Sequence, residues 1–187
     1  MRYYVVKYTG PFGFIKPWTA VRDGETFSQQ FLTPSIIEGL RQKLEVSSIL
    51  RHKLTYSAID AQQEVVQAKA LDYRRNSKLY FREKSILKRG VMLNPTLSLA
   101  FQTFEEAQRA SSQHICLCRN EDVLFPSENI ELMEKKDFDN LPGFELRFEK
   151  NEKAFMVGYN RFENNCPTYG WLDIVGNPIQ KPEYERL

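Results

Sequence analysis

The sequence predicts an α+β fold, because segments with strand-like and helix-like patterns alternate along its first 120 residues. Hydrophobic residues recur at every second position in residues 3–8 and 97–101, which is typical of half-buried strands. Two further segments, at Ser35 and at Thr103, carry helix-start signals. The resulting order is strand, helix, strand, insertion, strand, helix, strand. This is the order of the split βαβ, or ferredoxin-like (RRM-like), fold.

The first predicted strand covers residues 3–8 and ends at Gly10-Pro11. Residues 11–32 are predicted to form a loop, because glycines and prolines interrupt any regular pattern there. We expect three aromatic residues of this loop to be exposed, namely Phe12, Phe14 and Trp18.

The clearest boundary is a predicted capping box at Ser35-Ile36-Ile37-Glu38. In such a box the serine hydroxyl accepts from the backbone N–H three residues on, and the glutamate accepts from the serine N–H. Leu40 and Leu44 continue the helical spacing, so one face of this helix should pack on a core. Gly39 in the helix interior costs about 1 kcal/mol relative to alanine. We therefore expect another backbone to approach it closely.

Leu54, Tyr56 and Ala58 alternate with polar residues and predict a second strand. The segment that follows is basic and poorly periodic, but Lys78-Leu79-Tyr80-Phe81-Arg82 favours an extended conformation. Residues 62–92 are therefore interpreted as an inserted β-hairpin.

A third strand is predicted at residues 97–101, and a second capping box, Thr103-Phe104-Glu105-Glu106, opens a short helix. Residues 114–118 predict a fourth strand. These elements would form a ferredoxin-like domain over residues 1–120. Short strand-like stretches separated by turn residues then predict a small antiparallel β appendage over residues 121–187.

The net charge of +2 says little about partners, but the charge is unevenly distributed. Eight basic and two acidic residues lie between Lys69 and Arg89, which gives +6. Seven acidic and two basic residues lie between Glu121 and Asp139, which gives −5. Such asymmetry is expected of a protein with one polyanion-binding surface.

The basic insertion also contains Tyr73, Tyr80 and Phe81. Positive charge releases counterions from phosphates, and flat rings stack on bases, so together they favour single-stranded RNA binding. A merely solvated hairpin has equal weight on composition alone, and a scaffold that docks on an acidic partner is a further alternative. Residues 97–101 lack the aromatic signature of an RNA-recognition motif, so the insertion and the first loop are the predicted contacts.

An endoribonuclease is the alternative function. His52 lies between Arg51 and Lys53, which would attract RNA, and a general acid or base needs a pKa near the working pH. No partner at a defined spacing can be named for His52 or for His114, and a surface position is the favoured interpretation of His52. We therefore predict no catalytic residue.

The sequence gives no sign of a metal or cofactor. Cys116, Cys118 and Cys166 lack zinc-site spacing and are interpreted as reduced core residues. The glycines of residues 10–13 fit neither a phosphate loop nor a dinucleotide motif. No stretch approaches the roughly 18 apolar residues of a membrane span, and the start is too polar for a secretory signal, so we expect a cytoplasmic protein.

Two segments together carry a family resemblance: Gly10-Pro11-Phe12-Gly13-Phe14 and Leu32-Thr33-Pro34-Ser35-Ile36-Ile37-Glu38-Gly39-Leu40. They resemble the Cas-five family of CRISPR-associated proteins, whose members share an early G-P loop and a T-P-S-x-x-x-G-L helix start. Residues 82–84, 93–95 and 118–121 match more weakly. The resemblance covers about the first 120 residues.

The resemblance implies a RAMP-superfamily protein, whose β-hairpin thumb binds the 5′ handle of a CRISPR RNA (crRNA) in a Cascade-type interference complex. It also implies contacts with the large subunit and with a backbone subunit of that complex. One branch of the family cleaves precursor RNA with a tyrosine, lysine and histidine cluster, but no motif locates such a cluster in this sequence.

The predicted RNA-binding residues belong to the first loop, the first helix start and the insertion. Phosphate contacts are expected mainly from the basic residues of the insertion, and base stacking from its aromatic residues. The set comprises Lys16, Trp18, Ser35, Tyr73, Arg74, Arg75, Lys78, Tyr80, Phe81, Arg82, Lys84, Lys88 and Arg89.

Overall fold

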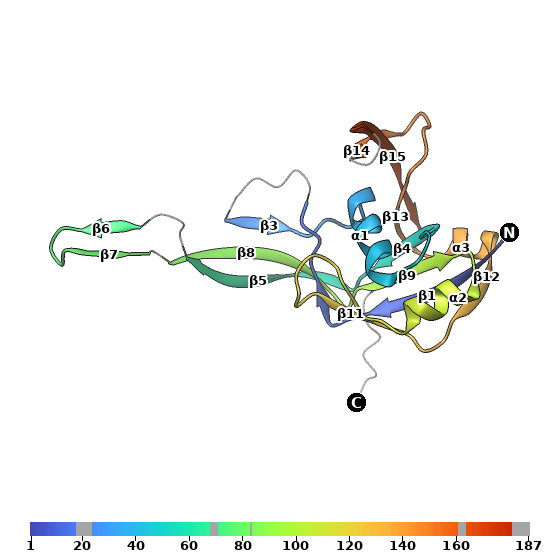
Figure 1. The fold of residues 1–187 in the computed structure, drawn as a ribbon, viewed down its shortest axis with the longest axis horizontal. Helices are drawn as coiled ribbons and strands as arrows, with labels where there is room; N and C mark the ends of the chain where they lie inside the picture. Colours follow the sequence, from blue (N-terminus) through green and yellow to red (C-terminus); the bar gives the residue numbers. More distant parts are fainter. Residues whose placement is uncertain (18–23, 68–70, 83, 161–163, 181–187) are drawn as a thin grey trace.

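The computed structural model describes residues 1–17, 24–67, 71–82, 84–160 and 164–180, and within them the predicted α+β class is confirmed. A nine-stranded sheet forms the body of the molecule, and a long two-stranded ribbon projects from it (Figure 1). Along the described residues, no helix combines the length and hydrophobicity that crossing a membrane requires.

The centre of the body is formed by three antiparallel strands. Strand β9 (Thr96–Phe101) lies between β1 (Arg2–Thr9) and β4 (Arg51–Thr55), and is antiparallel to both. Strands β1 and β4 therefore run parallel to each other, and the chain between them includes α1 (Pro34–Leu44). The predicted first and third strands are confirmed. The second ends earlier than predicted, because residues 58–67 belong to the ribbon.

The main core lies between the sheet and two helices, α1 and α2 (Phe104–Ser111). Val6 and Tyr8 of β1 point into it, whereas Tyr3 and Val5 point to the opposite face. There they pack against Phe138 of the short helix α3 (Lys135–Asn140). The central sheet is thus covered on both faces, which explains why its strands are buried almost throughout.

The start of α1 differs from the predicted capping box. Thr33 is the N-cap residue, and Pro34 takes the first helical position, where a missing N–H costs nothing. Ser35 lies inside the helix, with its Oγ 3.0 Å from Thr33 Oγ1, and Glu38 bonds to Arg41 instead of the helix start. The predicted box was wrong because the proline fixes the register two residues earlier.

The second predicted cap is confirmed, since Thr103 Oγ1 accepts from the backbone N–H of Glu106 at 3.3 Å. The Glu106 carboxylate accepts from the N–H of Ser47 at 2.9 Å and also from the Ser47 hydroxyl. Burial raises the pKa of Glu106, but these hydrogen bonds outweigh it and hold the pKa below its usual value. Glu106 therefore ties α2 to the end of α1.

The fourth strand predicted at residues 114–118 is shorter in the structure. Strand β10 (Ile115–Cys116) has two residues and pairs with β11 (Val123–Pro126). The position beside β1 is taken by β11 and by β12 (Glu131–Glu134).

The strands predicted after residue 120 are present, and they extend the central sheet at both sides. Strand β13 (Gly143–Arg147) pairs with β4 and with β15 (Cys166–Val175), which in turn pairs with β14 (Phe155–Asn160). All of these pairs are antiparallel. Strands β14 and β15 rise from the body as a second arm (Figure 1).

The predicted insertion is a β-hairpin, and it begins at residue 58 instead of 62. Strands β5 (Ala58–Gln67) and β8 (Lys84–Leu93) pair along their whole length, from Ala58 opposite Leu93 to Gln67 opposite Lys84. We call these two strands the ribbon. Beyond them, β6 (Asp72–Arg74) and β7 (Leu79–Phe81) form a small hairpin, and residues 71–82 are called the tip.

The first loop is partly ordered by the ribbon. Strand β2 (Phe12–Gly13) pairs antiparallel with β8, and β3 (Glu25–Phe27) pairs parallel with it. Phe14 was expected to be exposed, but it is buried, whereas Phe12 is half-buried. Trp18, also expected to be exposed, lies outside the described residues.

Candidate nucleic-acid interface

One face of the tip carries a pair of exposed aromatic rings. Tyr73 and Tyr80 are directly opposite each other on β6 and β7, with ring centroids 5.0 Å apart and planes inclined by 44°. They are 50% and 68% exposed. Because cross-strand neighbours point to the same side of a sheet, both rings are available on one surface for stacking with a flat ligand.

The other face of the tip carries Arg74 and Phe81. The Arg74 guanidinium carbon lies 3.9 Å from the centre of the Phe81 ring, which is cation–π contact. The sequence predicted phosphate binding by Arg74 and base stacking by Phe81. In the structure these two side chains stack on each other. Stacking orients the guanidinium while its N–H groups remain able to bond a phosphate.

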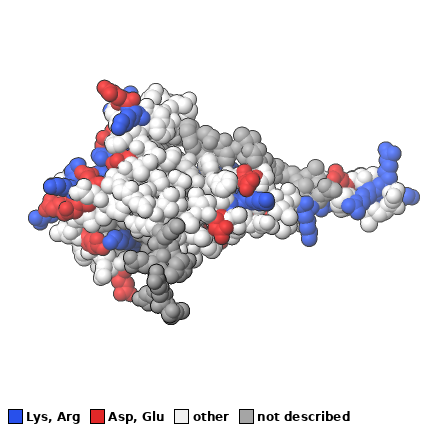
Figure 2. Space-filling view, turned by 180° about the vertical axis from the view of Figure 1, so that it is seen from behind, with Lys and Arg blue, Asp and Glu red and all other residues white. Residues whose placement is uncertain are grey.

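The turn of the tip presents further positive charge. Arg75 and Lys78 are exposed, and Lys78 has a left-handed backbone with φ of 53°. Within residues 71–82, four cations stand against the single acidic Asp72. Figure 2 shows blue atoms grouped at this free end, whereas blue and red are intermixed over the body. Arg82, where the tip meets the ribbon, is also exposed.

Two lysines of the ribbon share one face of β8. Lys84 and Lys88 are four residues apart and exposed, and Ile86 lies between them on the same side. Among the described residues, neither lysine has an ion-pair partner. This face of β8 therefore continues the positive surface of the tip toward the body.

Arg89, predicted to bind RNA, is engaged within the protein. Its Nε donates to Glu64 Oε2 at 2.7 Å, and its guanidinium lies 5.4 Å from the Phe14 ring centre. Arg119, which the sequence did not single out, stands at the same distance from Phe14, and donates to Asp122 and to Gln62. These two arginines join the base of the ribbon to the body.

The remaining predicted RNA-binding residues lie on other elements. Lys16 is exposed in the segment after β2, and Ser35 is exposed on α1. Trp18 lies outside the described residues. The candidate interface therefore comprises the tip and the β8 face of the ribbon.

His52, the residue considered for RNA cleavage, is buried instead of lying at the surface. It is 3% exposed, and its Nε2 accepts from the backbone N–H of Leu146 at 3.3 Å. Burial lowers the pKa of His52 to about 4 and outweighs the opposite effect of Glu145. A buried, neutral imidazole that already accepts a backbone hydrogen bond has no route to a substrate.

A buried ionic cluster surrounds His52, and no pattern in the sequence predicted it. Arg51 forms two hydrogen bonds with Glu145, at 2.5 and 2.8 Å, and a third with Asp139 at 2.8 Å. Burial raises the pKa of Glu145, but Arg51 outweighs it and holds the pKa below its usual value. Lys53 Nζ lies 3.6 Å from the Glu145 carboxylate and has no hydrogen bond among the described residues. Arg51, His52 and Lys53 are consecutive polar residues at the start of a strand, a pattern that predicts a surface position. In the structure β13 covers them.

His114 is exposed, and its ring lies 6.3 Å from that of Phe125. Among the described residues, no three of the side chains that bind metals, namely His, Cys, Asp and Glu, gather into a possible metal site. The cysteines of the chain are free thiols; Cys118 and Cys166 are exposed, not in the core as predicted, and Cys116 is half-buried.

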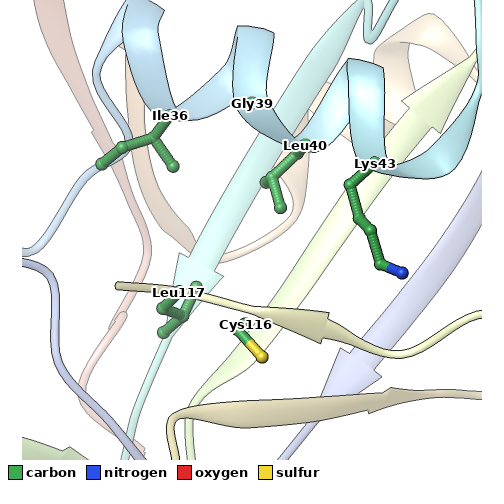
Figure 3. A pocket seen from close by; sticks show the side chains of 6 residues that line it. All are labelled: Ile36, Gly39, Leu40, Lys43, Cys116 and Leu117. Atoms are coloured by element: carbon green, nitrogen blue, oxygen red, sulfur yellow. The ribbon is translucent and has the colours of Figure 1, made fainter. Parts of the chain in front are cut away.

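A hollow of about 280 Å³ lies between α1 and β10 (Figure 3). Its lining is mainly apolar, with Ile36 and Leu40 pointing toward Leu117 and with Lys43 as the charged member. Gly39 lines it too, and a Cβ there would meet nothing within 4 Å. The expectation that another backbone approaches Gly39 was therefore wrong: the glycine leaves open space.

No family model matches the chain, and no curated protein matches it. Function is therefore inferred from the geometry of the tip and the ribbon, together with the local sequence resemblance.

Proposed function

We propose that this protein binds single-stranded RNA through the tip and the β8 face of the ribbon. One observation carries the proposal: the tip and the β8 face of the ribbon hold exposed aromatic rings together with cations that form no ion pair among the described residues, and they project from the body. The cations supply phosphate contacts, and Tyr73 and Tyr80 supply a stacking surface. The acid-poor tip adds no opposing charge beyond Asp72.

We further propose, from the resemblance to the Cas-five family, that the RNA is the 5′ handle of a crRNA. On this proposal the body is a ferredoxin-like RAMP domain and the ribbon is its thumb. The order of β1, β9 and β4, with α1 and α2 on one face, supports that interpretation because it is the split βαβ arrangement. The protein would act as a non-catalytic cap within a Cascade-type complex, in contact with its large and backbone subunits.

Charge reversal at the turn tests RNA binding. The variant with Arg74→Glu and Arg75→Glu should bind a single-stranded repeat RNA more weakly, and its affinity should depend less on salt. Each lost phosphate contact reduces the slope of log K against log[salt] by about 0.7, so two contacts should reduce it by about 1.4. Fluorescence anisotropy over a series of salt concentrations measures both quantities.

A matched control carries Arg109→Glu and Lys136→Glu. Both residues are exposed, on α2 and α3, and the net charge changes by the same amount. If this control lost as much affinity and slope as the tip variant, binding would reflect overall charge, and the proposed interface would be rejected. A handle RNA and an unrelated RNA of equal length separate the crRNA proposal from general RNA binding.

A further inference from the structure

Strand β5 has a free outer edge among the described residues. Its inner edge pairs with β8, whereas no described strand pairs with the other edge. The corresponding outer edge of β8 is partly occupied, since β2 and β3 pair there. An unpaired strand edge presents a row of N–H and C=O groups that another chain can use.

The hydrogen bond of Ala61 shows which residues face this edge. Ala61 donates its backbone N–H to the Asp60 carboxylate at 2.7 Å, so this N–H points away from β8. In a strand, backbone groups of alternate residues point to the same side, so Gln63 and Val65 face the same edge. Of these, Gln63 is exposed and Val65 is 65% exposed.

The edge lacks several of the features that usually prevent pairing with another chain. Residues 58–67 include no lysine, arginine, proline or glycine, and their register with β8 continues through ten pairs without a shift. Natural edge strands are commonly guarded by such residues or by a bulge. Val65 lies opposite Ile86, which is 57% exposed, so an apolar patch adjoins the edge.

The two strands of the ribbon carry side chains of opposite charge. Strand β8 carries Lys84, Lys88 and Arg89, whereas β5 carries only Asp60 and Glu64. Acidic side chains on β5 disfavour RNA there. They also disfavour a second copy of this chain, because a symmetric pairing of two β5 strands about Gln62 would place Asp60 opposite Glu64.

From these observations we propose that the outer edge of β5 binds an extended segment of a different protein, which adds a strand to the ribbon. The segment would place a basic side chain opposite Asp60 and an apolar side chain against Val65. The proposal does not depend on RNA binding, since it concerns the other strand of the ribbon.

The test uses the full chain, labelled for NMR, and an eight-residue peptide of alternating lysine and valine. At saturating peptide, amide exchange at Gln63 and Val65 should slow at least tenfold. Gln63→Pro should weaken peptide binding at least tenfold, because proline removes an outward N–H while leaving the bonds to β8 in place. Gln63→Ala, which keeps the N–H, should bind within twofold of the unchanged protein.

A second variant, Asp60→Lys, lies at an exposed position and should weaken binding of this cationic peptide at least fivefold. The proposal fails if millimolar peptide leaves the Gln63 and Val65 amides unprotected, or if Gln63→Pro and Asp60→Lys both bind normally. It also fails if an RNA oligonucleotide protects the same amides. The RNA affinity of Gln63→Pro is measured as well. If this variant binds RNA normally, the outcome of the peptide test does not depend on the proposed RNA interface.

Discussion

At the tip, the aromatic residues lie where a ligand could reach them, and Tyr80 is the more exposed of the pair. Stacking of a base on an aromatic ring contributes about 1 to 3 kcal/mol. Tyr80→Ala should therefore weaken binding of single-stranded RNA by about fivefold or more, measured by anisotropy at fixed salt.

Tyr80→Phe is the matched control, since it keeps the ring and removes only the hydroxyl. It should bind RNA nearly as well as the unchanged protein. Equal affinities of the alanine and phenylalanine variants would exclude a stacking role for Tyr80.

The buried imidazole of His52 makes stability depend on pH. Its folded pKa of about 4 is below the unfolded value of about 6.5, so the unfolded chain binds more protons between these values. The contribution of His52 is complete above pH 6.5 and is lost as the pH falls toward 4. Between pH 7.5 and 5.5 the free energy of unfolding should decrease by about 1 kcal/mol.

Urea unfolding at these two pH values measures the effect. His52→Gln can still accept from the Leu146 N–H but has no titratable group, so its stability should change little between them. A pH dependence of unchanged size in this variant would assign the effect to other residues.

At the scale of elements, two glycines of the resemblance segments have opposite surroundings. A Cβ at Gly10 would lie 2.4 Å from the backbone oxygen of Val123 in β11, whereas one at Gly39 would meet nothing within 4 Å. Gly10→Ala should therefore force β1 and β11 apart and destabilise the protein by about 1–3 kcal/mol, the usual cost of overpacking. Gly39→Ala should stabilise it by about 1 kcal/mol, because alanine favours a helix interior.

Thermal or urea unfolding of the two variants measures the difference. Because the two substitutions add the same methyl group, general effects of the mutation cancel in the comparison. Equal stabilities would show that the approach of β11 to Gly10 is not maintained in solution.

The elements that the sequence predicted well are those with local signals. Thr103 identified the start of α2, and alternation identified β1 and β9. Strand pairing between distant segments left no such signal: β12 pairs with β1, and β13 buries Arg51 and His52. At the candidate site, charge and aromatic content identified the tip, but neither could show that Arg89 is bound to Glu64.

At the scale of the whole molecule, the tip contributes nothing to the two hydrophobic cores of the described residues. Gln67 and Lys84 are direct partners, so a two-residue Asn-Gly turn can join them in place of residues 68–83. The shortened protein should unfold within about 2 °C of the full chain and should lose most of its RNA affinity.

Differential scanning calorimetry and anisotropy measure these two properties on the same sample. A large loss of thermal stability would mean that the tip supports the body. Retained RNA affinity would place the interface elsewhere on the molecule.

The pairing of β1 also bears on the order in which the chain can fold during synthesis. Residues 2–9 are synthesised before their partner strands, which lie in residues 96–101, 123–126 and 131–134. Strand β1 therefore stays unpaired until residues 96–101 have been synthesised, and its pairing is complete only after residue 134. Tyr3, Val5, Val6 and Tyr8, which end in the two cores, are exposed during that interval. Chaperone capture of the nascent chain is thus expected at residues 2–9.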